Sequence, residues 1–381
     1  MARHLASRGH EVRVLTGGGR YQDQEVRRLP PRERDHGVDV LRTWSPGLGK
    51  GRFWKRMVDL GAYLAGVLAG AAGTWSPDVV VAMTSPPFLG LAALAYRVRF
   101  RSRVVLWSMD RFPAALAAFG WLDASSSAYR GLECLERTLL ANVEQAIALD
   151  ADMARALGAS GARRVRVVPN WERAENFPED GAAAAAIRAR LGLEGRFVVL
   201  YSGNLGHDHE YRTLLDAAKR LADRPEVLFL FNGGGALHAG LDAAIRSEGH
   251  ANVRTHPFVP REDRAALLAA AAVNVVTLRE RIVSISTPSK TYGLLASGRP
   301  LLYVGPPVSE VARIVDREGC GFAARPGDAA AVERFVRELL ADPERGRALG
   351  ERARRAFLSR YEFRIAMSRM TEILEIRPAA E

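Results

Sequence analysis

Short runs of β-branched and aliphatic residues recur along this chain with helix-like stretches between them, and this alternation restricts the fold more than any other feature. Nine runs are predicted as strands: Glu11–Leu15, Asp78–Met83, Arg103–Ser108, Gln145–Leu149, Arg164–Val168, Phe197–Gly203, Val227–Gly235, Val273–Leu278 and Pro300–Gly305. Near-continuous Val and Leu strands separated by helices are typical of parallel sheets covered by helices on both faces. The chain is therefore predicted to be an α/β protein.

Two domains are expected, because 381 residues exceed what a single compact core usually holds. The first series of strands ends near Val167–Trp171, and a fresh series begins at Phe197. We place the boundary near Pro169–Pro178, with one doubly wound domain over residues 1–172 and another over 173–356. A helix over about residues 357–381 is expected to pack back on the first domain. Ligands of such sheets bind at the carboxyl ends of the strands, so the cleft between the domains is the expected site.

The sequence opens on a helix-like stretch that stops at Gly9 and leads into the strand Glu11–Leu15. A doubly wound domain usually opens with a strand and a glycine-rich turn. We therefore expect the gene to encode these elements about 20–30 residues upstream. Without them, one side of the Glu11–Leu15 strand has no partner.

The net charge of +11 arises from 54 Lys and Arg against 43 Asp and Glu. Such a charge favours an acidic partner such as anionic lipid or a nucleotide, although a GC-rich genome that encodes arginine freely explains it equally well. Basic residues are scattered and no nucleic-acid-binding module is present, so no nucleic-acid partner is expected.

The cysteines and the hydropathy pattern indicate a cytoplasmic location. Cys134 and Cys320 lack the spacing of a zinc site or a disulfide framework, which fits a reducing compartment. No run of about 18 apolar residues predicts a membrane-spanning helix. Charges at Arg3, Arg8 and Glu11 interrupt the apolar stretch that a signal peptide needs.

Six segments together carry a family resemblance. They are LASRGHEVRVLTGG (Leu5–Gly18), VVPNW (Val167–Trp171), YSGNLG (Tyr201–Gly206), FNGGG (Phe231–Gly235), TPSKTYGLLASGRPLLYVG (Thr287–Gly305) and EGCGFAARPGD (Glu318–Asp328). In combination they resemble the retaining family-4 glycosyltransferases of the GT-B fold. The resemblance is closest to a subgroup with a PSK motif that adds amino- or deoxysugars to bacterial envelope glycans.

The resemblance implies two Rossmann-like domains facing a cleft, with the acceptor bound by the first and a nucleotide sugar by the second. It implies transfer of a hexosyl or N-acetylhexosaminyl group, with a UDP-sugar as the favoured donor and with retention at the sugar. The acceptor would be a glycan, a lipid-linked intermediate or a small molecule, and no metal or cofactor would be needed. Two alternatives remain: a UDP-sugar epimerase, and a degenerate GT-B module that binds a partner without catalysis.

The donor diphosphate is expected at the loop that follows the Phe197–Gly203 strand. Gly203, Asn204 and Gly206 precede a helix, and glycines let the backbone approach a phosphate at a helix N-terminus. A turn that merely needs small residues is the alternative. The resemblance adds Gly234, in the glycine turn of the following strand, to the donor-binding residues.

The neighbouring His207, Asp208, His209 and Glu210 are all of metal-ligand type. Adjacent residues rarely point the same way, and no second cluster completes a site, so no metal is predicted. Relatives often carry an arginine and a lysine around this loop, where this chain has Asn204 and His209.

Lys290 is one of only four lysines in a chain rich in arginine. Pro288 precedes it, so Ser289, Lys290 and Thr291 are predicted in the first turn of a helix, where backbone N–H groups are free and an anion is favoured. Lysine suits a phosphate as a compact point charge on a flexible stem. We therefore predict that Ser289, Lys290 and Thr291 bind the donor diphosphate and that Lys290 stabilises the leaving group. A solvated lysine on a surface helix is the alternative.

The acceptor is expected at the ends of two strands in the first domain. Thr84 and Ser85 follow the strand Asp78–Met83, and Asp110 follows the strand Arg103–Ser108. Asp110 is predicted to orient the acceptor hydroxyl or to act as a base. The alternative for Asp110 is the N-cap of a helix that begins at Pro113.

One departure from the family pattern affects the nucleotide. The E-x7-E glutamates of many relatives fall at Ile285 and Gly293 in this chain. The second of those glutamates usually holds the ribose, so the resemblance leaves the ribose contacts of this chain unassigned.

The segment Lys50–Gly70 pairs basic residues with Phe53 and Trp54 ahead of an apolar helix too short to span a bilayer. We predict that it docks on anionic lipid and guides a lipid-linked acceptor, whereas a core helix with a solvated basic flank would not. Co-sedimentation with anionic vesicles distinguishes the two, because the double variant Phe53→Ser/Trp54→Ser should lose binding. Equal binding by both proteins, or binding by neither, would reject membrane docking.

Overall fold

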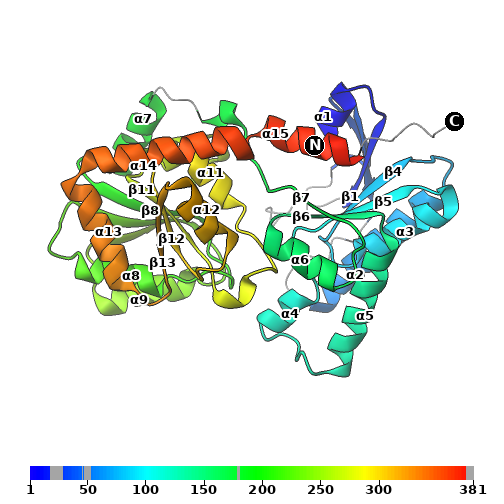
Figure 1. The fold of residues 1–381 in the computed structure, drawn as a ribbon, viewed down its shortest axis with the longest axis horizontal. Coiled ribbons are helices and arrows are strands. Elements are labelled where there is room, and N and C mark those ends of the chain that lie inside the picture. The colour runs from blue at the N-terminus through cyan, green and yellow to red at the C-terminus, as the bar shows by residue number, and fades with distance from the viewer. Residues whose placement is uncertain (18–28, 45, 47–52, 178–180, 375–381) are drawn as a thin grey trace.

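The computed structural model describes residues 1–17, 29–44, 46, 53–177 and 181–374 (Figure 1). The first domain begins with a short helix and contains seven strands in its described part. Its elements are α1 (Ala2–Ser7), β1 (Val12–Gly17), β2 (Arg32–Asp35), β3 (Val38–Thr43), α2 (Phe53–Ala72), β4 (Val79–Met83), α3 (Leu89–Phe100), β5 (Arg103–Trp107), α4 (Ala114–Ala118), α5 (Ser127–Asn142), β6 (Gln145–Ala148), α6 (Ala151–Ala159) and β7 (Val165–Val167).

The second domain is one parallel sheet of six strands with helices on both faces. Its elements are η1 (Ala174–Asn176), α7 (Ala182–Leu191), β8 (Phe197–Asn204), α8 (Arg212–Arg220), β9 (Val227–Gly234), α9 (His238–Glu248), β10 (Val253–His256), η2 (Arg261–Asp263), α10 (Arg264–Ala270), β11 (Val273–Thr277), η3 (Glu280–Ile282), α11 (Lys290–Ala296), β12 (Leu301–Val304), α12 (Glu310–Glu318), β13 (Gly321–Ala324), α13 (Ala329–Ala341) and α14 (Pro343–Ala356). The chain ends with η4 (Phe357–Tyr361) and α15 (Phe363–Leu374).

All nine predicted strands are present, and four further strands were missed. The missed strands are β2, β3, β10 and β13. Three of them, β2, β10 and β13, lie at sheet edges, and β3 alternates apolar with polar residues. Such strands do not need the continuous apolar run of a strand buried on both faces, so the sequence pattern does not mark them.

The strands of the first domain form two sheets rather than the single sheet expected. One has the order β1-β3-β2, with β1 parallel and β2 antiparallel to β3, and the other is the parallel sheet β4-β5-β6-β7. Among the described residues, β1 and β4 are therefore each an outer strand, paired on one side only.

Strands β8, β9, β11, β12 and β13 of the second sheet each place residues against two apolar cores, one on either face. In β8, Val198 and Leu200 join the core on one face, while Val199 and Tyr201 join the core on the other. The sheet is thus buried on both faces, as continuous apolar strands require. The six strands follow the order β10-β9-β8-β11-β12-β13, all parallel, which brings the carboxyl ends of β8, β9 and β11 together at one edge.

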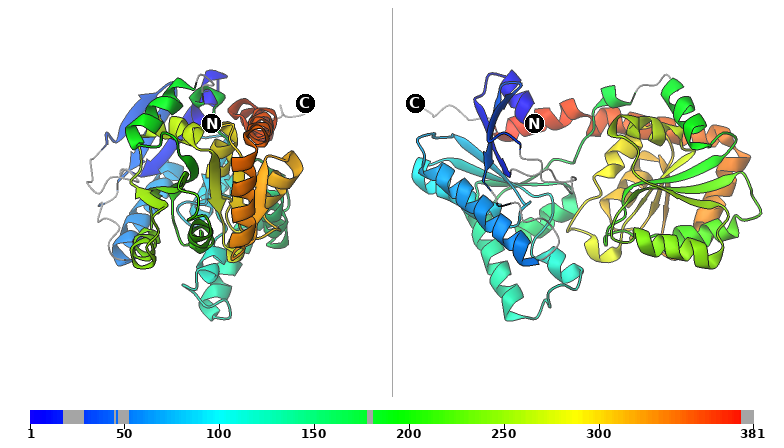
Figure 2. Two further views of the ribbon diagram at one scale, coloured as in Figure 1. Left: turned by 90° about the vertical axis from the view of Figure 1, so that its left-hand side faces the viewer. Right: turned by 180° about the vertical axis from the view of Figure 1, so that it is seen from behind.

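Helix α15 connects the two domains a second time. The chain leaves the second domain through α14 and then runs along the first, so that α14 and α15 follow one side of both (Figures 1 and 2). Ala366, Met367 and Met370 of α15 pack against Val105 and Trp107 of β5 and complete the core on that face of the β4–β7 sheet. The hinge segment adds Trp171, whose ring stacks on that of Trp107 with centroids 5.5 Å apart.

Truncating the buried face of α15 should therefore destabilise the protein. Met367 is fully buried, so Met367→Ala should lower the free energy of unfolding by about 2–5 kcal/mol through lost burial and a residual cavity. Ser368→Ala on the exposed face of the same helix should change it by less than about 0.5 kcal/mol. Urea denaturation followed by tryptophan fluorescence measures both, and equal effects of the two changes would contradict the packing described.

Candidate active site

The loop after β8 is shaped by the close approach of two strands. Gly203 has φ 137° and Gly233 of β9 has φ 141°, a left-handed region that favours glycine. A Cβ on Gly233 would lie 2.1 Å from the carbonyl oxygen of Gly203, so a side chain cannot be accommodated there. The loop consequently lies at the sheet edge with Gly203 and Asn204 at the open end of β8.

Lys290 reaches this loop from the first residue of α11. Its ammonium donates a hydrogen bond to Tyr201 Oη at 2.6 Å and lies 3.5 Å from the carbonyl oxygen of Asn204. Tyr201 in turn donates to the same carbonyl oxygen at 3.0 Å. A Cβ on Gly203 would lie 3.2 Å from the Lys290 Nζ atom. The structure therefore brings together Lys290, Gly203 and Asn204, which the sequence placed in separate motifs.

The surroundings of Lys290 disfavour the charged form of its side chain. Burial lowers the pKa of the Lys290 ammonium to about 7, and the nearby Asp208 carboxylate partly offsets that effect. The ammonium also lies 4.1 Å from the centroid of the Tyr201 ring, within the range of a cation–π contact. The charged form of Lys290 is therefore less favoured than that of a solvent-exposed lysine.

His209 contributes a neutral imidazole to the same edge. Burial and, to a smaller extent, the charge of Lys290 lower its pKa to about 4, and Asp208 acts in the opposite direction. Its Nδ1 atom contacts the carbonyl oxygen of Thr277 at the end of β11, and its Nε2 atom lies 3.3 Å from Asp208 Oδ2. A neutral imidazole can donate only one of these two hydrogen bonds.

Asp208 is the residue that the sequence analysis missed as part of this arrangement. It was considered only as a metal ligand, but its charge acts on Lys290, His209 and Asp110. Its neighbours point elsewhere: His207 is exposed, whereas His209 is buried. In the described part of the chain, no three His, Cys, Asp or Glu residues gather as a metal site requires.

Asp110 lies at the boundary with the second domain and contacts it directly. It forms an isolated antiparallel bridge with Ser286, and the amide of Arg111 donates to the carbonyl oxygen of Ile285 at 2.9 Å. The side chain of Thr84 fixes the same turn by accepting from the amides of Met109 at 3.0 Å and Asp110 at 3.2 Å. Two of the three residues predicted to bind the acceptor, Thr84 and Asp110, are thus in contact.

The position of Asp110 between the domains raises the pKa of its carboxyl group. Desolvation by the surrounding protein raises its pKa, a hydrogen bond with Ser286 lowers it, and the negative charge of Asp208 raises it. The alternative role as a helix cap was wrong. The helix begins at Ala114, its N-cap is Pro113, and no side chain caps it.

The remaining predicted residues differ in how far they are exposed to solvent. Ser85 and Ser289 are exposed, and Gly234 is partly buried beside the ring of Phe258. Gly206 is buried, with Asp208 Oδ1 2.6 Å from where its Cβ would lie. The side chains of Phe53 and Trp54 lie outside the described residues, although the backbone of α2 begins at Phe53.

The expectation of a free backbone amide at Thr291 was wrong. That amide donates to the carbonyl oxygen of Pro288 at 3.1 Å, and the residue has no exposed surface. The chain forms a turn at Pro288 before α11 begins, so the first amides of the helix are partly used by that turn. Lys290 is therefore the residue of this segment whose side chain reaches the loop after β8.

The two positions where relatives carry glutamates are occupied differently here. Ile285 is buried, and Gly293 lies beneath an ion pair between Arg264 and Glu172. A Cβ on Gly293 would lie 2.6 Å from a guanidinium nitrogen of Arg264. The space that a side chain at position 293 would take is thus filled by the arginine.

No helix in the described ranges combines the length and the apolar character needed to cross a bilayer.

Comparison with known proteins agrees with this architecture. A family profile described as a glycosyl transferase 4-like domain matches residues 1–171, and one described as glycosyl transferases group 1 matches residues 184–356. Among curated proteins, the chain is 28% identical over 265 residues to a probable glycosyltransferase, WbjE, of Pseudomonas aeruginosa. That match covers 69% of this chain and 66% of the relative.

Two further relatives span most of the chain. The putative colanic acid biosynthesis glycosyl transferase WcaI of Escherichia coli K12 is 24% identical over 370 residues, which cover 93% of this chain and 90% of the relative. The solved structure of Anabaena Alr3699/HepE in complex with UDP-glucose superposes with a TM-score of 0.66 at 16% identity. The superposition covers 89% of this chain and 86% of the HepE chain. Given both family profiles and the two-domain architecture, this chain is a family-4-like glycosyltransferase of the GT-B fold.

Proposed function

We propose that this protein transfers a hexosyl or N-acetylhexosaminyl group from a UDP-sugar, with retention, to a glycan, lipid-linked or small-molecule acceptor. The observation that carries the proposal is the contact of Lys290 with the glycine loop after β8. A lysine ammonium beside a glycine-lined turn is an arrangement suited to a diphosphate. The similarity to a structure that holds UDP-glucose supports a uridine donor.

The chemistry requires stabilisation of a leaving group whose charge grows. As the bond between the sugar and the diphosphate breaks, negative charge develops on the diphosphate and positive charge on the sugar ring. Lys290 would supply a fixed donor where the negative charge develops. Gly203 and Asn204 would let the phosphates approach the backbone, and Gly206, Gly234 and Ser289 would line the remainder of the donor site.

The acceptor would be held by the opposite wall of the cleft. Asp110, fixed by Thr84 and by the bridge to Ser286, would orient the acceptor hydroxyl and accept its proton. Its raised pKa makes it a stronger base than a carboxylate of ordinary pKa. Ser85 would contribute to the outer part of this acceptor groove. For a lipid-linked acceptor, α2 would hold the protein at the cytoplasmic membrane surface.

An epimerase or a binding module would use the same fold differently. An epimerase would return the nucleotide sugar in altered form, and a binding module would return it unchanged. Incubation with a UDP-sugar labelled in its sugar therefore separates the three functions. Label in an acceptor product, with UDP released, supports transfer; label that remains in a nucleotide sugar rejects it.

One prediction from this proposal concerns the charge of Lys290. Lys290→Ala should lower kcat/KM by about 10²–10³-fold, on the scale of losing one preorganised donor, and Lys290→Arg should recover only part of the loss. Lys219→Ala, on the exposed end of α8, should leave kcat/KM unchanged. Steady-state kinetics with a UDP-sugar measure all three, and near-normal turnover by Lys290→Ala would show that the donor site is misplaced.

The second prediction follows from the low pKa of the same group. In the free protein Lys290 titrates near pH 7, so at pH 8 it is mostly neutral. A bound diphosphate favours the charged form, raises the pKa and draws a proton from solution. UDP affinity should therefore fall as the pH rises above about 7, with uptake of about one proton per UDP at pH 8. Calorimetry in buffers of different ionisation enthalpy measures this uptake, which should vanish in Lys290→Met.

A further inference from the structure

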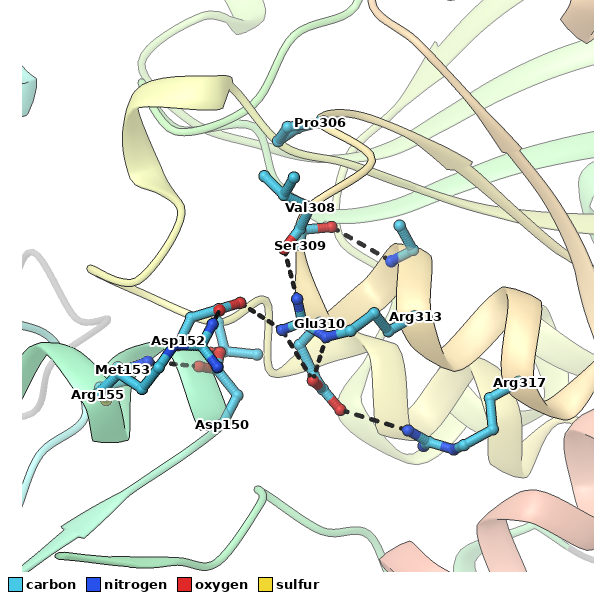
Figure 3. A network of polar contacts seen from close by, with 12 residues as sticks. Asp150, Asp152, Met153, Arg155, Pro306, Val308, Ser309, Glu310, Arg313 and Arg317 are labelled. Carbon is cyan, nitrogen blue, oxygen red and sulfur yellow. Dashed lines mark hydrogen bonds and ion pairs between the residues drawn. The ribbon is translucent and has the colours of Figure 1, made fainter.

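A series of buried polar contacts joins the two domains next to the candidate site (Figure 3). On the first-domain side, Asp150 caps α6 by accepting the amide of Met153 at 2.7 Å. The second carboxylate oxygen of Asp150 accepts a hydrogen bond from the hydroxyl of Thr287 in the second domain. Asp150 and Thr287 are only 5% and 6% exposed, so water does not substitute readily for either partner.

A second contact between the domains is made by Asp152, two residues after Asp150. Asp152, on the first turn of α6 and 8% exposed, accepts from the guanidinium of Arg313 on α12. The same guanidinium is held from its own domain by the carbonyl oxygen of Val308 at 2.6 Å and by Glu310 at 3.1 Å. These contacts within the second domain hold the Arg313 side chain in place, so its guanidinium donates to Asp152 from only one direction.

These contacts determine geometry more than they add stability. A buried carboxylate loses its hydration, and hydrogen bonds of good geometry must compensate. Each carboxylate has one partner within α6, since Asp150 accepts the amide of Met153 and Asp152 pairs with Arg155. The second oxygen of each is compensated from the other domain, by Thr287 and by Arg313, only in one relative position of the two domains. A small shift between the domains would leave one oxygen of each nearly buried carboxylate without its partner, so the arrangement discriminates between domain positions.

The same boundary holds the segment that leads into Lys290. Ile285, Ser286 and Thr287 are successive, and each receives a contact from the first domain. Ser284, just before them, has φ 64°, a left-handed conformation that a non-glycine residue adopts only when its surroundings impose it. Lys290 begins α11 three residues after Thr287. The segment that the first domain contacts therefore leads directly into the helix that carries the Lys290 ammonium.

We propose that Asp150, Asp152, Thr287 and Arg313 form an interdomain latch that positions Lys290 for the donor diphosphate. These are positioning residues, since they act on the ligand through the 284–290 segment. With the latch formed, residues 285–287 are fixed and Lys290 meets the loop after β8. With the latch broken, the segment is released and the donor is held less tightly. The role in donor binding rests on the proposed function, whereas the hold of the latch on the segment does not.

The hydroxyl of Thr287 offers a sharp test. Thr287→Val keeps the size of the side chain and removes the donor to Asp150, whereas Thr287→Ser keeps the donor. Thr287→Val should speed amide hydrogen exchange in residues 282–292 and raise the dissociation constant of UDP about 5- to 100-fold, the effect of leaving a buried carboxylate without its partner. Thr287→Ser should stay close to wild type in both measurements. Arg347→Ala removes an exposed ion pair within α14 and should change neither.

Asp152→Asn is the second variant, for the case that Thr287→Val does not fold. It keeps the shape of the side chain and should produce the same two changes, because it removes the charge that Arg313 meets. Unaltered exchange in a folded Thr287→Val or Asp152→Asn protein overturns the latch. Faster exchange with unaltered UDP affinity overturns its role in positioning Lys290. If the wild type does not bind UDP at all, the proposed function is wrong, and the exchange measurement still decides whether the latch exists.

Discussion

The apolar faces of the parallel sheets are the constraint on which the rest of the structure depends. A strand such as β5 has apolar residues on both sides, so its sheet needs a covering layer on each face. On one face of the β4–β7 sheet, that layer is α15, which follows the whole second domain in the sequence. The first domain is thus completed from the carboxyl end of the chain, and the two domains are joined at two crossings, the hinge near Trp171 and η4.

Polar groups from both domains meet at contact distance at the boundary between them. Asp110 bridges Ser286 and Asp150 contacts Thr287, in the segment that follows β11 and leads to Lys290 at the carboxyl end of β8. Parallel sheets place their ligand loops at this edge. The candidate acceptor base and the donor lysine are therefore separated by a single short segment, residues 285–289.

The electrostatics of the cleft depend on burial more than on the number of charges. Lys290 and His209 both have pKa values lowered by desolvation, and Asp208 opposes that shift at each. One carboxylate thus stabilises the charged form of two groups that burial would otherwise keep neutral. A diphosphate entering this space would add further negative charge, and the lysine, whose pKa is already near 7, would respond by taking a proton.

The sequence by itself determined the α/β class, the nine strands buried by their apolar runs, and the glycines at the ends of β8 and β9. These features depend on local composition and on the two-residue period of strands, which tertiary contacts rarely override in long apolar runs. It also singled out Lys290, because a lone lysine after a proline at a helix start needs a reason. It did not mark the edge strands β10 and β13, which are four residues long and pair with a neighbouring strand on one side only.

Only the tertiary structure decided which of these residues act together. The role of Asp208 depends on its distance from Lys290 and Asp110, which come from different parts of the chain, and no local pattern encodes such distances. The turn at Pro288, which uses the amide of Thr291, directly follows residues 285–287, which contact the first domain. The space beside Gly293 is likewise taken by Arg264, a residue 29 positions away in the sequence, because α10 packs against α11. The sequence specifies the chemistry of each side chain, but the distances that make these side chains a site arise only when the two domains are in contact.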